Sequence, residues 1–203
     1  MSIPYELTGR THQKARTRSA LIAAARELLA EGVTPTVEQA ADRAAISRTT
    51  AYRYFPNHVA LVVATYPDIE APSLLKAAAP TDPLERLEIV IEDYTRQIVE
   101  YEPELRAQLR LSLEPTRPHP EALPFRQGRA IGWIEDALSP LRNRMKHDEL
   151  RRLVLAIRAT TGIEALVWLT DLAGLSREEA IEIMRSSAIT LARSAITNGA
   201  TPD

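Results

Sequence analysis

The sequence contains no cysteine, carries no large excess of charge of either sign and has no long apolar run. The absence of cysteine excludes disulfides and thiolate chemistry, and it fits a reducing compartment. No N-terminal segment combines a basic start, an apolar core and a cleavage site, and no uninterrupted apolar run approaches the ~20 residues of a membrane-spanning helix. We therefore expect a soluble, cytoplasmic protein without a membrane partner.

Motifs of the common enzyme and metal sites are also missing. The histidines at 12, 58, 119 and 147 show neither H-x-x-x-H nor H-E-x-x-H spacing, so no dedicated metal site is expected. The sequence has no G-x-S-x-G, G-x-x-x-x-G-K-[ST] or G-x-G-x-x-G motif. We predict no metal, no cofactor and no enzymatic activity. A single sequence leaves open only a Ser/His/Asp trio assembled in space.

Charge is distributed unevenly along the chain. The formal net charge of −2 argues by itself against a general nucleic-acid binder. Residues 1–66, however, carry eight Lys and Arg against five Asp and Glu, a net charge of +3, whereas the remainder carries 17 against 22, a net charge of −5. A basic N-terminal third on an acidic body supports a protein with a DNA-binding end.

Apolar residues recur at helical spacing through most of the 203 residues, and no strand pattern is present, so the predicted fold is all-α. Residues 1–17 lack this period and are expected to form a mobile arm. The proline-rich stretch 67–83 separates an N-terminal domain, 1–66, from a helical domain, 67–203. Helices are predicted at 18–31, 83–101, from 103 with Leu105, Leu109 and Leu113, 126–138 (kinked or restarted at Ser139-Pro140), 148–173 and 176–198.

The most informative stretch is TVEQAADRAAISRTTAYRYFPNH, residues 36–58. Thr36 and Gln39 form a T-x-x-Q capping box, and Ser47 is a good N-cap for a second short helix that ends near Phe55. Asn57 then caps another helix. In the second helix Ala51 and Phe55 share one face, and donors and hydroxyls occupy the other. This arrangement predicts a helix-turn-helix whose second helix fits a DNA major groove.

The stretch resembles the DNA-binding signature of the TetR/AcrR family of transcriptional regulators. Ten positions match that pattern in register: Thr36, Val37, Ala41, Ala44, Ser47, Thr50, Tyr52, Tyr54, Phe55 and Leu61. Three positions depart from it. Ala45 replaces the turn glycine, so a left-handed backbone there would cost roughly 1 kcal/mol. Thr49 replaces a small glycine, and His58 replaces a lysine that usually meets phosphate.

The resemblance implies DNA-contacting roles for eight positions of this stretch. Arg48, Thr49, Thr50 and Arg53 become candidate base readers, and Thr36, Ser47, Tyr52 and His58 match phosphate-holding positions. The alternative for an arginine is a solvated surface charge, and for Tyr52 it is packing.

The resemblance also implies a homodimer and an effector. The helices at 148–173 and 176–198 are apolar over more than half of their surface, and they resemble the family's C-terminal helix pair, which packs against the same pair of a second subunit. The alternative is a monomer that buries this surface in its own core. A small effector would lie among the body helices. Candidate lining residues are Tyr94, Tyr101, Leu109, Trp133, Glu164 and Trp168, although aromatic side chains at helical spacing are more often core.

The resemblance thus implies a ligand-responsive repressor that binds a pseudo-palindromic DNA operator as a homodimer, and the sequence itself leaves repression or activation open. Two other interpretations remain open. The helix-turn-helix could serve an adaptor as a protein-interaction surface, or the chain could be a small all-α enzyme. The basic N-terminal third favours DNA, whereas Ala45 and His58 argue slightly the other way.

Overall fold

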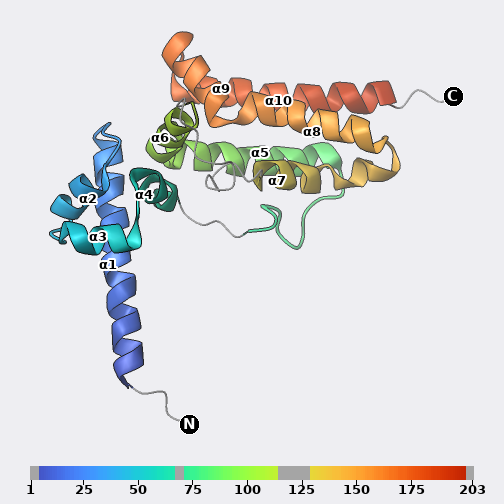
Figure 1. The fold of residues 1–203 in the computed structure, drawn as a ribbon. Coiled ribbons are helices and arrows are strands. Elements are labelled where there is room, and N and C mark those ends of the chain that lie inside the picture. The colour runs from blue at the N-terminus through green and yellow to red at the C-terminus, as the bar shows by residue number, and fades with distance from the viewer. Residues whose placement is uncertain (1–4, 67–70, 114–128, 200–203) are drawn as a thin grey trace. The chain divides into compact units, whose positions relative to one another are not determined.

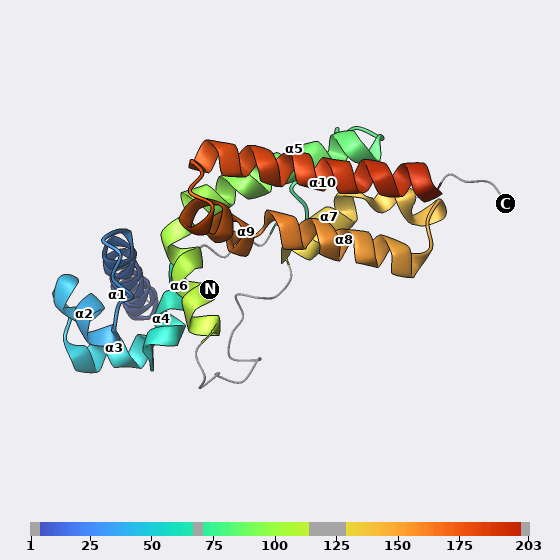
Figure 2. The same cartoon turned by 90° about the horizontal axis from the view of Figure 1, so that it is seen from above.

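The computed structural model describes residues 5–66, 71–113 and 129–199, with side chains from 12 to 197 of these ranges. Every regular element in the described residues is helical, which confirms the all-α prediction (Figures 1 and 2). The chain divides into two compact units. We call Met1–Asp68 with Pro103–Phe125 the head unit, and Ile69–Glu102 with Arg126–Asp203 the bundle unit.

The head unit contains α1 (Tyr5–Ala30), α2 (Val37–Arg43), α3 (Arg48–Tyr54), α4 (His58–Thr65) and most of α6 (Glu102–Ser112). Its main core is small because alanines supply much of it. α1 contacts α2 and α4, and α2 contacts α3, around a shared cluster of buried side chains: Leu21, Ala25, Val37, Ala40, Ala41, Ala51, Phe55 and Leu61. A second cluster joins α6 to α1 and α4 through Leu29, Val62, Ala107 and Leu111.

Helix α1 begins at Tyr5, before the predicted start at 18, and takes in most of the stretch expected to form a mobile arm, residues 1–17. Described side chains between 12 and 20 are nearly all exposed, so this part of α1 has no apolar face for a periodicity argument to find. In α6 the buried face carries Glu104, Ala107, Gln108 and Leu111, whereas Leu105 and Leu109 are half-buried and Leu113 is 72% exposed. The buried face of this helix is therefore part polar and part apolar.

The bundle unit is built from four long helices, α5 (Pro83–Glu100), α7 (Arg129–Ala137), α8 (His147–Thr161) and α10 (Arg177–Gly199). α5 and α8 each pack against both α7 and α10, which closes a four-helix arrangement (Figure 2). Large side chains fill its centre, among them Leu87, Ile91, Ile98, Ile134, Ile157 and Met184. The 3₁₀ helix η3 (Ser139–Asn143) restarts the chain after α7 at the predicted Ser139-Pro140 step.

The single helix predicted at 148–173 is broken. Gly162 has an extended backbone (φ −88°, ψ 177°) between α8 and the short α9 (Ile163–Val167), which continues into the π-helical turn η4 (Trp168–Leu172). A Cβ on Gly162 would lie 1.8 Å from Nη1 of Arg158, because the Arg158–Glu164 ion pair folds over this position. Hydrophobic periodicity continues through a break of this kind, so the sequence pattern does not reveal it.

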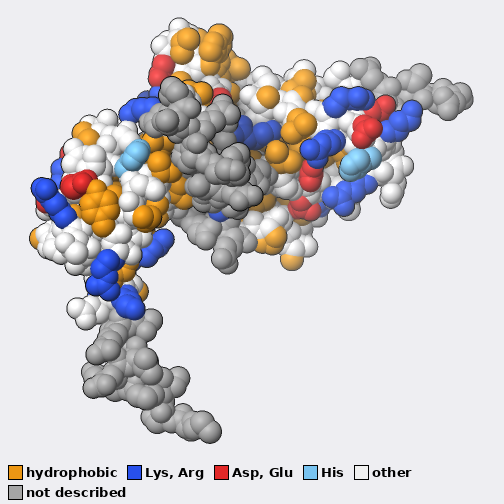
Figure 3. All heavy atoms as spheres, viewed as in Figure 1, with side chains coloured by type: hydrophobic (Ala, Val, Ile, Leu, Met, Phe, Trp, Pro, Cys, Tyr) orange, Lys and Arg blue, Asp and Glu red, His pale blue; other side chains and the backbone are white. Residues whose placement is uncertain are grey.

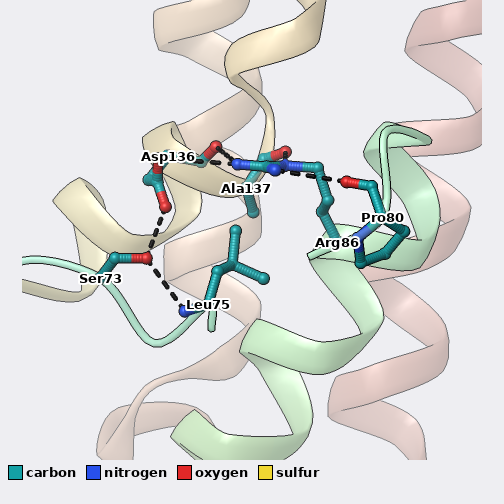
Figure 4. A network of polar contacts seen from close by, with 6 residues as sticks. All are labelled: Ser73, Leu75, Pro80, Arg86, Asp136 and Ala137. Carbon is teal, nitrogen blue, oxygen red and sulfur yellow. Dashed lines mark hydrogen bonds and ion pairs between the residues drawn. The ribbon is translucent and has the colours of Figure 1, made fainter. Parts of the chain in front are cut away.

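The segment before α5 is fastened to the bundle by polar contacts (Figure 4). The Ser73 hydroxyl donates to the Asp136 carboxylate over 2.6 Å, and Arg86 donates to the carbonyls of Ala137 (3.0 Å), Asp136 (2.9 Å) and Pro80 (3.3 Å). Nε1 of Trp133 donates to the carbonyl of Ala71 over 2.8 Å. The proline-rich stretch is therefore tied to α5 and α7 from Ala71 onwards.

Candidate nucleic-acid interface

The turn between α2 and α3 is fixed by its own backbone hydrogen bonds. The N–H of Ile46 donates to the carbonyl of Ala41 (2.9 Å) and that of Ala45 to Asp42 (3.2 Å), the pattern of a Schellman stop. Ala45 has a φ of 54°, the one positive value at a non-glycine among the described residues. The left-handed turn expected at this position is confirmed, and an alanine there carries a strain of roughly 1 kcal/mol.

Side-chain caps begin each of the short head helices as the sequence predicts. The Thr36 hydroxyl accepts from the N–H of Gln39 (3.1 Å), whose side chain accepts from the N–H of Thr36 (2.8 Å). Ser47 accepts from the N–H of Thr50 (3.3 Å), and its hydroxyl donates to the Thr50 hydroxyl (2.8 Å). Asn57 caps α4 by accepting from the N–H of Ala60 (2.8 Å). Three helix starts are thus held in register by short-range contacts.

The helix α3 has one buried and one exposed face. Ala51 and Phe55 are buried in the head core, and the Arg18 guanidinium lies 5.6 Å from the centre of the Phe55 ring. The opposite face presents exposed side chains of four predicted DNA-contacting residues, Arg48, Thr49, Tyr52 and Arg53. This short helix can therefore offer donors and hydroxyls to another molecule without unfolding its own core.

The remaining predicted contact residues lie at helix starts. Thr36 and Ser47 are the N-caps of α2 and α3, Thr50 is half-buried against Ser47, and His58 is exposed in the first turn of α4. All the predicted DNA-contacting residues thus belong to the head unit, on α2, α3 and α4.

Two acidic side chains that the sequence reasoning missed face α3. Asp42 lies 3.3 Å from Nη2 of Arg48, and the Tyr52 hydroxyl donates to the carboxylate of Glu38. This hydrogen bond lowers the pKa of Glu38 and raises the pKa of Tyr52. Glu38 and Asp42 are four residues apart on α2, as Arg48 and Tyr52 are on α3. Figure 3 shows acidic and basic side chains side by side over these helices.

Arg43, another basic residue of the head, is bound to acidic side chains of α1. Arg43 donates to both carboxylate oxygens of Glu31 (2.9 and 3.0 Å) and to Glu27 (3.4 Å), which joins α2 to α1. The hydrogen bond from Arg43 lowers the pKa of Glu31. Arg43 therefore acts as a brace between α2 and α1.

The structure brings together only part of the predicted effector set. In the bundle unit the buried rings of Tyr94 and Trp133 lie 6.0 Å apart at 67°, an edge-to-face contact. Tyr101 is the half-buried C-cap of α5, and Glu164 is exposed and paired with Arg158 (3.2 Å). Trp168 is 57% exposed. Leu109 lies on α6 in the head unit.

The described residues were also compared with the requirements of a metal site and of a membrane span. No group of three or more His, Cys, Asp and Glu side chains is placed to hold a metal ion in these ranges. One stretch, His147–Leu172, is long and apolar enough to cross a membrane by length and composition. One such stretch is weak evidence for a membrane span, because the packed core helix of a soluble protein passes the same test.

Comparison with protein families supports the interpretation of the head. Residues 21–65 match the family described as bacterial regulatory proteins, tetR family. The matched range runs from α1 through α4 and contains every predicted DNA-contacting residue. The predicted resemblance is confirmed over these residues. A search of curated proteins finds no match for the chain.

Proposed function

From a tetR-family DNA-binding domain at residues 21–65, which makes this chain a DNA-binding transcriptional regulator, we propose a ligand-responsive repressor that binds a pseudo-palindromic operator as a homodimer. The observation that carries the proposal is the exposed polar face of α3, held by the Ser47 cap and the Ala45 turn within that domain. A short, rigid helix with a polar outer face fits the major groove, whose base edges carry a readable pattern of donors and acceptors.

Base reading is assigned to the arginines and threonines of α3. An Arg48 or Arg53 guanidinium that bonds O6 and N7 of a guanine would discriminate against other bases by about 1–3 kcal/mol. The substitution Arg53→Ala should therefore relax sequence preference. Tyr52→Ala should weaken binding to all sequences alike, because phosphate contacts carry no sequence information. A footprinting series that shows neither pattern would contradict these assignments.

A mobility-shift titration tests DNA binding directly. The probe is the DNA upstream of the protein's own gene, and the salt concentration is varied from about 50 to 200 mM. Affinity should fall steeply over this range, because each phosphate contact releases counterions. No shift at about 50 mM salt would count heavily against a repressor, and it would favour an adaptor that uses the head for a protein partner.

Dimerisation is assigned to α8 and α10 because one recognition helix reads only half of a palindromic site. These helices pack on each other, and each has an apolar side chain that is 42% exposed, Leu155 on α8 and Ile183 on α10. The double variant Leu155→Arg/Ile183→Arg should shift a dimer to monomer in sedimentation and weaken operator binding. A monomeric wild-type protein that still shifts DNA would overturn this part of the proposal.

The effector site is placed at the buried Tyr94–Trp133 pair, which suits an apolar or aromatic ligand. Trp133 also holds the carbonyl of Ala71 in the segment that precedes α5. An effector that displaces the indole would release this segment, and it acts as an inducer only if it prefers the released conformation. In the variant Trp168→Phe the remaining tryptophan is buried, so its fluorescence reports on ligands at this pair alone.

Substitution of His58 tests its contact with DNA phosphate. If His58 holds phosphate, His58→Gln should weaken binding to every DNA sequence alike, because phosphate contacts carry no sequence information. Unchanged affinity in His58→Gln would leave backbone binding to Tyr52 and the arginines.

A further inference from the structure

Two acids of α2 face two donors of α3 as matched pairs. Glu38 and Asp42 are one turn apart, as are Tyr52 and Arg48, and each donor meets one acid: Tyr52 meets Glu38, and Arg48 meets Asp42. Asp42, Arg48 and Tyr52 are exposed, and Glu38 is half-buried. These contacts lie on the surface that the proposed function presents to DNA, so carboxylates already occupy donors that phosphates or bases would use.

The two pairs differ in what they leave available. A guanidinium has five N–H donors, and Arg48 uses only Nη2 on Asp42, so it can bind a guanine at the same time. A phenol has a single proton, and Tyr52 gives it to Glu38. Tyr52 therefore cannot donate to a phosphate until that bond breaks. An ionised carboxylate is also an acceptor of the same kind as a phosphate oxygen.

We propose that Glu38 is an internal competitor for the Tyr52 hydroxyl, which DNA phosphate must displace, and that it holds the affinity of the head for every DNA sequence below the value that Tyr52 could give. The inference rests on the proposed function. Exchange of one anionic acceptor for another returns little free energy, and the Glu38 charge then remains beside the DNA backbone. The hydrogen bond from Tyr52 lowers the pKa of Glu38, so the competitor remains charged at neutral and mildly acidic pH.

The central experiment is a double-mutant cycle in DNA affinity. Wild type, Glu38→Gln, Tyr52→Phe and the double variant are titrated by fluorescence anisotropy against a labelled mixed-sequence duplex about three helical turns long. Glu38→Gln should bind about tenfold more tightly. In the Tyr52→Phe background the same change should give no more than about twofold. Glu38→Ala provides a second test of the same prediction.

Two matched controls separate this effect from net charge. Asp42→Asn removes the same charge one turn away and leaves Tyr52 bound to Glu38, so it should tighten binding by less than about threefold. Glu88→Gln removes the same charge from an exposed position of α5 and should leave affinity unchanged. Circular dichroism checks that each variant keeps its helix content.

The outcomes distinguish this inference from the function beneath it. Wild type that binds the duplex, with no gain from Glu38→Gln, overturns the inference alone. An equal gain from Glu38→Gln in both Tyr52 backgrounds also overturns it, because the effect then reports only the removed charge. Wild type that binds no duplex at about 50 mM salt, where phosphate binding is strong, overturns the inference together with the proposed function.

Discussion

The head and bundle units are held together in different ways. In the head, side chains cap α2, α3 and α4 at their N-termini, and backbone bonds at Ala45 close the turn between α2 and α3. In the bundle, Asp82 and Ser176 cap α5 and α10, but α8 begins at Lys146 and α9 at Gly162 without a side-chain cap, and large residues fill the core. The head thus combines capped short helices with a core of small alanines, and the bundle adds the packing of large side chains between distant segments.

The largest expected effect tests the bundle side of this comparison. Ile134 is fully buried, so Ile134→Ala should leave a cavity and lower the free energy of unfolding by about 2–5 kcal/mol. Thermal or urea unfolding measures the loss. Ile89 is 39% exposed, and Ile89→Ala should cost less than about 0.5 kcal/mol. Similar losses for both variants would mean that the bundle core is not packed as described.

A smaller effect tests the head. Asn57→Ala removes the cap that accepts from Ala60, so the stability of the head should drop by about 1 kcal/mol. Hydrogen exchange of the α4 amides measures this loss where it occurs. Asn143 is an exposed residue at the end of η3, and Asn143→Ala should leave exchange in α4 unchanged. If α4 is equally protected in Asn57→Ala, the cap is not what stabilises it.

A gain in stability is expected at the turn. Ala45→Gly should stabilise the protein by about 0.5–1 kcal/mol, because glycine adopts a φ of 54° without strain. Ala44 next to it has an ordinary right-handed backbone with a φ of −82°, so Ala44→Gly should destabilise by a similar amount. Opposite signs in thermal unfolding would confirm the strain. A loss in both variants would contradict it.

The smallest effect depends on pH. Burial raises the pKa of Glu104, against its own backbone hydrogen bond and Arg26 at 3.9 Å, so the folded state holds this proton more tightly than the unfolded state. Stability should therefore fall as pH rises from the ordinary glutamate range through the raised pKa. Glu104→Gln should remove this slope and add no more than about 0.5 kcal/mol above it. Exposed Glu100 gives the matched control Glu100→Gln, which should keep the slope.

The difference between local capping and long-range packing explains what could be predicted from the sequence. Caps at Thr36, Ser47 and Asn57 all occur where predicted, since each depends on a residue three positions away. The left-handed turn at Ala45 follows from the same local register. Helix starts, the turn and the polar face of α3 could therefore be derived before any tertiary contact was known.

What depends on distant segments could not be derived. The Glu38–Tyr52 bond requires the angle between α2 and α3, although acids and donors at matching four-residue spacing were a usable signal. Glu104 and Gln108 lie on the buried face of α6, because the partner surface decides which side of a helix is covered. The effector candidates had no local signal either; Tyr94 and Trp133 are brought together by the packing of α5 on α7.

The packing of α6 also decides what can be removed from this chain. Its Ala107 and Leu111 cover Leu29 of α1 and Val62 of α4, so a segment that follows the bundle helix α5 completes the head. The two units are interleaved rather than consecutive. A fragment that stops at residue 66 would expose the apolar side chains of Leu29 and Val62, and it would lose the Arg110–Thr34 hydrogen bond. The head of this protein is therefore not a detachable module, even though the part that matches the family fits within 45 consecutive residues, 21–65.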